Sequence, residues 1–162
     1  MFPDCYWVQK GRLLAGEYPS RADRPETRRS LARLRGLGVT LFVDLTERGE
    51  YGLVPYQPEL DEGIRAIRKP VPDFGCPSTA EMGEVLDLID VELAAGGVVY
   101  VHCYGGVGRT GTVVGCFLVR HGASPKDALE AISRLRAKTR TAARSSPETE
   151  VQRELILSWR AD

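Results

Sequence analysis

Apolar residues recur at helical spacing in the segment that follows Ser78. Ser78 and Glu81 have the spacing of a capping box, and Gly96-Gly97 would end the helix. The apolar residues that would share one face are Met82, Val85, Leu86, Ile89 and Leu93. One apolar face of this kind is typical of a helix that packs against a core. The pattern therefore predicts a helix with one buried side between Ser78 and Gly96.

Short apolar and β-branched runs predict strands elsewhere in the chain. Residues 39–43 and 98–101 are almost wholly apolar, as expected for strands that are buried on both faces. Residues 64–67 predict one further strand. Residues 46–62 have no period and contain several glycines and prolines, so they indicate a surface loop.

Further helices are expected between and after these strands. Helical spacing predicts helices over residues 25–35 and about 109–120, and Ser-Pro pairs at 124–125 and 146–147 would start two more. The residues expected on the inner face of the last helix are Val151, Leu155 and Trp159. Strands that alternate with helices predict an α/β domain, with a central, mostly parallel sheet of about four to five strands flanked by helices.

Length and net charge narrow the possible partners. A chain of 162 residues has the usual size of one domain, so we expect a single domain over residues 1–162. Lys plus Arg and Asp plus Glu both number 22, so no overall field attracts nucleic acid or an anionic membrane surface. We expect neither as a partner, and we expect a monomer.

Charge is nonetheless placed unevenly along the chain. Residues 77–96 carry five acidic side chains and no base, whereas residues 134–144 carry five basic side chains and no acid. Two solvated helix faces would explain both runs, and this is the interpretation that we favour. A docking patch is the alternative.

The N-terminus and the cysteines bear on location and metal binding. Residues 1–5 lack the basic start and apolar run of a signal peptide, and no later stretch approaches the length of a membrane span. The four cysteines, which have no CxxC spacing, are Cys5, Cys76, Cys103 and Cys116. We therefore expect a cytoplasmic protein with free thiols, no metal and no cofactor.

The candidate for chemistry lies where the strand at 98–101 meets the helix at 109–120. The residues that join them are His102, Cys103, Tyr104, Gly105, Gly106, Val107, Gly108 and Arg109. Loop amides and a helix N-terminus converge on an anion site, and glycines let the backbone curl closely around it. Cys103 would place a thiol beneath the anion, and Arg109 a bidentate donor beside it. The local field would favour the thiolate, which could attack phosphorus to form a phosphocysteine.

Three other interpretations of this loop must be weighed. Residues 106–111 fit the GxGxxG dinucleotide fingerprint, but no acid ends a second strand about twenty residues later. The loop nearly fits a nucleotide-binding P-loop, but Cys103 replaces its first glycine and Arg109 its lysine. A small buried cysteine beside a surface arginine is the third. Of the four cysteines, only Cys103 has an arginine six positions later, which favours the phosphate-binding loop.

Residues 102–110 resemble the HCxxGxGR[ST] loop of the protein tyrosine phosphatase superfamily, and the short chain is similar to its dual-specificity branch. Residues 11–19, the loop around Asp73 and residues 146–152 also follow in the order found in compact bacterial members. The resemblance thus covers nearly the whole chain. It implies a cysteine-phosphatase fold and a metal-independent hydrolase of phosphoproteins, with phosphotyrosine and phosphoserine or phosphothreonine all open.

The leaving oxygen needs a proton, which a carboxylic acid near the loop must supply. Asp73 is the best candidate, because it lies thirty positions before Cys103 in a proline-rich loop. The resemblance places the family's acid in the matching loop. An ordinary turn aspartate is the alternative, and the weaker candidates for the acid are Asp44, Glu47 and Glu50.

The resemblance also implies supporting roles for three residues. His102 would shape the loop and support the thiolate. Thr110 would donate a hydrogen bond to the departing thiolate, although it could equally cap the helix. Gln152 would position the hydrolytic water, although a polar residue beside an apolar helix stripe is also ordinary. As in some relatives, Cys76 could form a protective disulfide with Cys103.

Substrate class is less constrained than reaction chemistry. A lysine-rich loop would favour phosphoinositides, whereas residues 104–108 carry no charge, so phosphoprotein is the preferred substrate class. Tyr104 could narrow the pocket toward phosphotyrosine or lie against the core. The alternatives are a catalytically weak phosphate-binding module, an inositol phosphate or phosphoinositide phosphatase, and a nucleotide- or dinucleotide-dependent enzyme.

Overall fold

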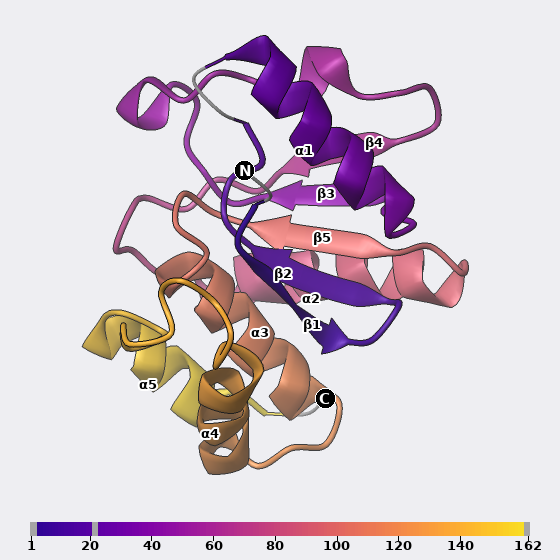
Figure 1. Cartoon of the computed structure of the whole chain (residues 1–162). Helices are drawn as coiled ribbons and strands as arrows, with labels where there is room; N and C mark the ends of the chain where they lie inside the picture. Colours follow the sequence, from indigo (N-terminus) through magenta and orange to yellow (C-terminus); the bar gives the residue numbers. More distant parts are fainter. Residues whose placement is uncertain (1–2, 21–22, 161–162) are drawn as a thin grey trace.

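A five-stranded sheet with the strand order β1-β2-β5-β3-β4 forms the centre of the molecule (Figure 1). The strands are β1 (Cys5–Gln9), β2 (Leu13–Gly16), β3 (Leu41–Asp44), β4 (Arg65–Arg68) and β5 (Val99–His102). β1 pairs antiparallel with β2, and the other pairs are parallel. This computed structural model describes residues 3–20 and 23–160, so Met1 and Phe2 of the N-terminal sequence lie outside the described residues. The predicted α/β architecture with a mostly parallel sheet is confirmed.

The hairpin of β1 and β2 was not predicted from the apolar pattern. Each strand has only four or five residues, and a tight turn closed by a hydrogen bond from the Arg12 amide to the Gln9 carbonyl joins them. Runs this short show no clear period. β2 is nevertheless an interior strand between β1 and β5, and its Gly16 is in register with His102 at the end of β5.

Helices cover both faces of the sheet (Figure 1). They are α1 (Arg24–Gly36), α2 (Thr79–Ala94), α3 (Gly108–Arg120), α4 (Pro125–Leu135) and α5 (Glu150–Ser158), with short 3-10 turns η1 (Glu50–Gly52) and η2 (Gln57–Glu59). α1 covers one face and α2–α5 the other. Within the described residues, no helix is both long and apolar enough to cross a membrane.

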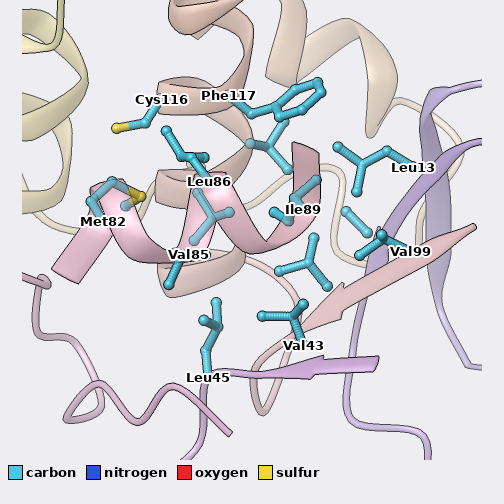
Figure 2. Close-up of a cluster of buried hydrophobic side chains, with 14 of the residues drawn as sticks. Leu13, Val43, Leu45, Met82, Val85, Leu86, Ile89, Val99, Cys116 and Phe117 are labelled. Carbon is cyan, nitrogen blue, oxygen red and sulfur yellow. The ribbon is translucent and has the colours of Figure 1, made fainter. Parts of the chain in front are cut away.

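The predicted apolar face of α2 is confirmed. Its five apolar residues are buried, and Ser78 and Glu81 form the expected capping box. Figure 2 shows part of this face packed between the sheet residues Val43 and Val99 and the α3 residue Phe117. Burying such side chains contributes roughly 1.5–3 kcal/mol each, so this layer is a main source of stability for the sheet that carries the candidate loop.

The inner face of α5 differs from the prediction. Val151 is 60% exposed, whereas Ile156 is 0% exposed and packs on Gly115 of α3. Trp159 is buried as expected, although it caps the helix rather than lying within it. The helix starts later than predicted, because the side chain of Thr149 forms the N-cap. The prediction is thus wrong for Val151, while Leu155 is partly buried against the core and the fully buried positions of the helix are Gln152 and Ile156.

Most side chains of the two charged runs are exposed as expected, but one residue in each run is buried. Arg136 is buried and donates hydrogen bonds to the Thr141 and Arg144 carbonyl oxygens, so it stabilises the turns that follow α4. In the acidic run, Glu92 is buried and accepts a hydrogen bond from Thr40. The prediction of solvated faces was therefore wrong for these two residues, since the tertiary fold covers both with polar partners.

The corrected face of α5 can be tested by truncating its side chains. We expect Ile156→Ala to lower the free energy of unfolding by about 2–5 kcal/mol, because it leaves a cavity between α5 and α3. Val151→Ala on the same helix should change it by no more than about 0.5 kcal/mol. Urea titration at equilibrium measures both. A loss for Val151→Ala as large as that for Ile156→Ala would contradict this packing.

Candidate active site

The predicted phosphate-binding loop leaves β5 and enters α3. Cys103 follows the last residue of β5, and Gly108 is the first residue of α3. Cys103 is almost completely buried, yet it lines a pocket of about 290 Å³ together with Asp73, Tyr104 and Val107. The loop thus has the strand-loop-helix setting that an anion site requires.

Gly106 lets the loop lie against the end of β2. Its φ of +71° is in the left-handed region, and a Cβ atom there would lie 2.5 Å from the carbonyl carbon of Gly16. Nearby, the Tyr18 amide donates a hydrogen bond to the Tyr104 carbonyl at 3.0 Å. The unpredicted strand β2 therefore supports the loop through its backbone.

His102 lies buried beneath the loop. Its Nδ1 is 3.3 Å from the Cys103 carbonyl oxygen, which can only accept, so Nδ1 carries the hydrogen. The other nitrogen, Nε2, is 2.7 Å from the Tyr56 hydroxyl and accepts from it in the neutral ring. Burial lowers the pKa of His102, although the nearby Asp44 opposes that shift. A neutral His102 thus anchors the backbone of the candidate nucleophile.

Two of the weaker candidates for the acid lie away from the pocket. Asp44 is buried beside His102, accepts hydrogen bonds from Thr46 and pairs with Arg68. Burial alone would raise the pKa of the Asp44 carboxyl, but His102 and the hydrogen bonds from Thr46 and Arg68 lower it. Glu47 lines a different cavity. Neither carboxylate borders the pocket of Cys103 among the described residues.

Arg109 joins the third weak candidate, Glu50, in a bidentate ion pair. Nη1 and Nη2 of Arg109 donate to the two Glu50 oxygens at 2.7 and 2.6 Å. Nη1 also donates to the Val71 carbonyl at 2.9 Å, and Nη2 donates to Asp73 at 3.0 Å. Burial alone would lower the pKa of Arg109, but Glu50, Cys103 and Asp73 raise it. Glu50 therefore orients the guanidinium, a role that its position in an aperiodic loop did not indicate.

Asp73 lies at the pocket with its two oxygens in different surroundings. Oδ1 accepts from Arg109 and from the Phe74 amide at 3.0 Å, and both of these groups can only donate. Oδ2 accepts from the Tyr51 hydroxyl at 2.7 Å, and a hydroxyl can also accept. A proton on Asp73 therefore belongs on Oδ2, the oxygen that could give it away.

Gln152 is buried and lies behind the loop that carries Asp73. Its Nε2 donates to the Gly75 carbonyl at 2.9 Å, and its Oε1 accepts from the Glu148 and Thr149 amides. Gln152 is not among the described residues that line the pocket. In this structure its amide ties the Asp73 loop to the start of α5, and a contact with hydrolytic water stays a prediction.

Thr110 is buried near the end of β2. Its hydroxyl is 3.5 Å from the Gly16 carbonyl oxygen, at the outer limit of a hydrogen bond, and α3 has no side-chain cap. The alternative of helix capping is therefore not realised, while a contact with a departing thiolate stays a prediction.

All four cysteines are free thiols in this structure. Burial raises the pKa of Cys76 and of Cys116, and the nearby Cys76 raises that of Cys116 further.

Comparison with known proteins gives matches over nearly the whole chain. The family model described as "PTP-SAK: Swiss Army Knife protein, DSP-PTPase phosphatase domain" matches residues 3–155. A solved structure of Tk-PTP in the active form is similar with a TM-score of 0.78 and 28% identity, over 96% of this chain and 95% of that chain.

Two curated relatives show the range of named substrates. One is protein 067L of Invertebrate iridescent virus 3, whose name describes it as a tyrosine phosphatase. It is 36% identical to this chain over 73% of this chain and 47% of its own length. The phosphatidylglycerophosphate phosphatase PTPMT2 of Arabidopsis thaliana is 34% identical over 67% of this chain and 45% of its own length. The chain spans about half the length of these two curated relatives.

The lowered pKa of His102 predicts a pH dependence of stability. Unfolded His102 takes up a proton as the pH falls through about 6.5, whereas the buried ring of the folded protein takes one up only at lower pH. This stability is present above pH 6.5 and is lost as the pH falls, with a slope of at most about 1.4 kcal/mol per pH unit for one proton. Asp44 contributes in the same direction only below about pH 4.

Urea titrations between pH 7.5 and 5.5 would measure this slope. We expect His102→Asn to flatten it, whatever the variant does to stability at neutral pH. The matched control is His121→Asn, since His121 is exposed and these are the chain's two histidines. An unchanged slope in His102→Asn would contradict a neutral buried ring.

Proposed function

This chain belongs to the DSP-PTPase phosphatase family of the PTP-SAK model, and on that premise we propose that it hydrolyses phosphoproteins through a phosphocysteine intermediate. The chain is a dual-specificity or tyrosine phosphatase domain. The observation that carries the finer proposal is that Cys103 and Asp73 line one pocket while Arg109 reaches Asp73. Nucleophile, acid and phosphate clamp are thus available at one site.

In the first step the Cys103 thiolate attacks phosphorus, so that a sulfur–phosphorus bond forms and the bond to the leaving oxygen breaks. The proton on Oδ2 of Asp73 moves to that oxygen, and an alcohol or phenol departs. Loop amides and Arg109 hold the other phosphate oxygens. The Nε–H of Arg109 has no hydrogen-bond partner among the described residues, so it is available to phosphate.

In the second step water attacks phosphorus and passes a proton to the Asp73 carboxylate. The sulfur–phosphorus bond breaks, Cys103 leaves as a thiolate and inorganic phosphate departs. Glu50 keeps the guanidinium of Arg109 oriented through both steps, because its bidentate contact lies on the side away from the phosphate oxygens in this scheme. We propose that Thr110 supports the departing thiolate and that Gln152 acts by holding the Asp73 loop.

A phospholipid or inositol phosphate headgroup is the second candidate substrate, because relatives such as PTPMT2 are named for phosphatidylglycerophosphate. Phosphoprotein remains the preferred class. Arg144 is the one cation among the described residues that line the pocket, and it is paired with Glu148, while Arg109 is buried and reaches the pocket residue Asp73. A headgroup with several phosphates would need more positive charge than this pocket offers.

Hydrolysis of p-nitrophenyl phosphate without added metal tests the proposed function. We expect turnover by the wild-type chain and at least about a thousandfold loss in Cys103→Ser, because the alcohol is a much weaker nucleophile than the thiolate. Cys116→Ser, which changes a buried cysteine away from the pocket, is the matched control and should retain activity. A requirement for magnesium or NAD, or phosphopeptide binding without turnover, would overturn the proposal.

The role of Asp73 predicts a dependence on the leaving group. Asp73→Asn should slow the hydrolysis of phenyl phosphate by about 10²–10⁴-fold, the usual range for a general acid. The loss for p-nitrophenyl phosphate should be far smaller, since p-nitrophenolate departs without a proton. Single-turnover rates for the two esters give the comparison. Equal losses for both esters would reject Asp73 as the acid.

A further inference from the structure

Three exposed aromatic rings gather at the mouth of the candidate pocket. Tyr51, Phe74 and Tyr104, here called the aromatic collar, are 67%, 55% and 49% exposed, and all three line the pocket of Cys103. Across residues 3–20 and 23–160, every other Phe, Tyr and Trp side chain is buried or half-buried. Exposed apolar side chains that gather in one place are typical of a binding site, whereas single exposed residues are common over any protein surface. The gathering of these rings at one pocket therefore indicates a recognition site.

Two members of the aromatic collar are held in a costly backbone conformation. Tyr51 has φ +47° and Phe74 has φ +59°, and they are the two non-glycine residues with positive φ in the described part of the chain. Such positions cost of order 1–3 kcal/mol and persist where the surrounding structure enforces them. Here the conformation turns an aromatic side chain toward the pocket from each of two loops.

The aromatic collar is also attached to the proposed acid. The Tyr51 hydroxyl donates to Oδ2 of Asp73 at 2.7 Å, and the Phe74 amide donates to Oδ1 at 3.0 Å. Tyr51 packs edge-to-face on Tyr104, with ring centroids 5.3 Å apart and an interplanar angle of 62°. The positions of the three rings and of the Asp73 carboxyl group therefore depend on one another.

We propose that the aromatic collar selects phosphotyrosine over phosphothreonine, and that Tyr51 is a positioning residue for Asp73. This inference rests on the proposed function. The ring of a phosphotyrosine whose phosphate reaches Cys103 lies at the level of the three rings, where aromatic pairs are favourable. A phosphothreonine has no ring to contact them, and its short side chain would force the peptide backbone between them.

Hydrolysis of two peptides that differ only in phosphotyrosine or phosphothreonine tests the selection. We expect wild-type kcat/KM to favour phosphotyrosine by about a hundredfold, the combined effect of three ring contacts. Phe74→Asn and Tyr104→Leu, which leave the Tyr51 hydroxyl on Asp73 in place, should each lower the phosphotyrosine value about threefold to tenfold and change the phosphothreonine value by less than about twofold. Asparagine suits position 74 because it tolerates positive φ.

Val91→Ala, which changes an exposed apolar residue of α2 away from the pocket, is the control and should leave both peptides unaffected. Equal kcat/KM for the two peptides would overturn the selection while leaving the phosphatase function standing. Faster turnover of phosphatidylglycerophosphate vesicles than of either peptide would also overturn it. Absence of turnover on p-nitrophenyl phosphate would instead remove the function on which the inference rests.

The positioning role of Tyr51 needs a separate variant that keeps the ring. Tyr51→Phe should preserve the preference for phosphotyrosine but lower kcat on phenyl phosphate about threefold to tenfold, with little change on p-nitrophenyl phosphate, since only the former needs the acid. Equal effects on both esters would show that the hydroxyl does not position the acid.

Discussion

The buried guanidinium of Arg109 is the interaction on which the rest of the site depends. It extends from the start of α3 to Glu50 in the loop after β3 and to Val71 and Asp73 in the loop after β4. Three segments that are distant in sequence thus meet at one planar cation. Because a buried charge without partners is very costly, the fold that buries Arg109 must also bring these acceptors to it. The site is therefore assembled by the same contacts that stabilise its surroundings.

The opposite side of the loop depends on backbone contacts and neutral groups. Gly106 lies against the end of β2, while His102 connects the Cys103 carbonyl to Tyr56 below it. Together these contacts hold the loop in place without adding a second cation beneath the nucleophile. Arg109 and Arg144, each paired with a glutamate, supply the positive charge near Cys103, and this limited charge suits a single phosphomonoester better than a polyanionic headgroup.

The sequence alone predicted much of the fold and the centre of the site. Residues that are close together in the sequence specify α2, the buried strands β3 and β5, and the loop between β5 and α3. Local sequence patterns predict such elements well. The hairpin of β1 and β2 was missed because its strands are too short to show a period. Val151 was wrongly assigned to the inner face of α5 because the starting point of that helix depends on the cap at Thr149.

Sequence by itself determined that Cys103 and Arg109 share a strand-loop-helix, since they lie only six positions apart along the chain. Only the tertiary structure decided that Glu50 orients the arginine rather than serving as the acid, and that Gln152 holds the Asp73 loop. It also gathered Tyr51, Phe74 and Tyr104 at one pocket. These relations join segments about 20 to 80 positions apart, and side-chain packing rather than local periodicity sets the distances between them.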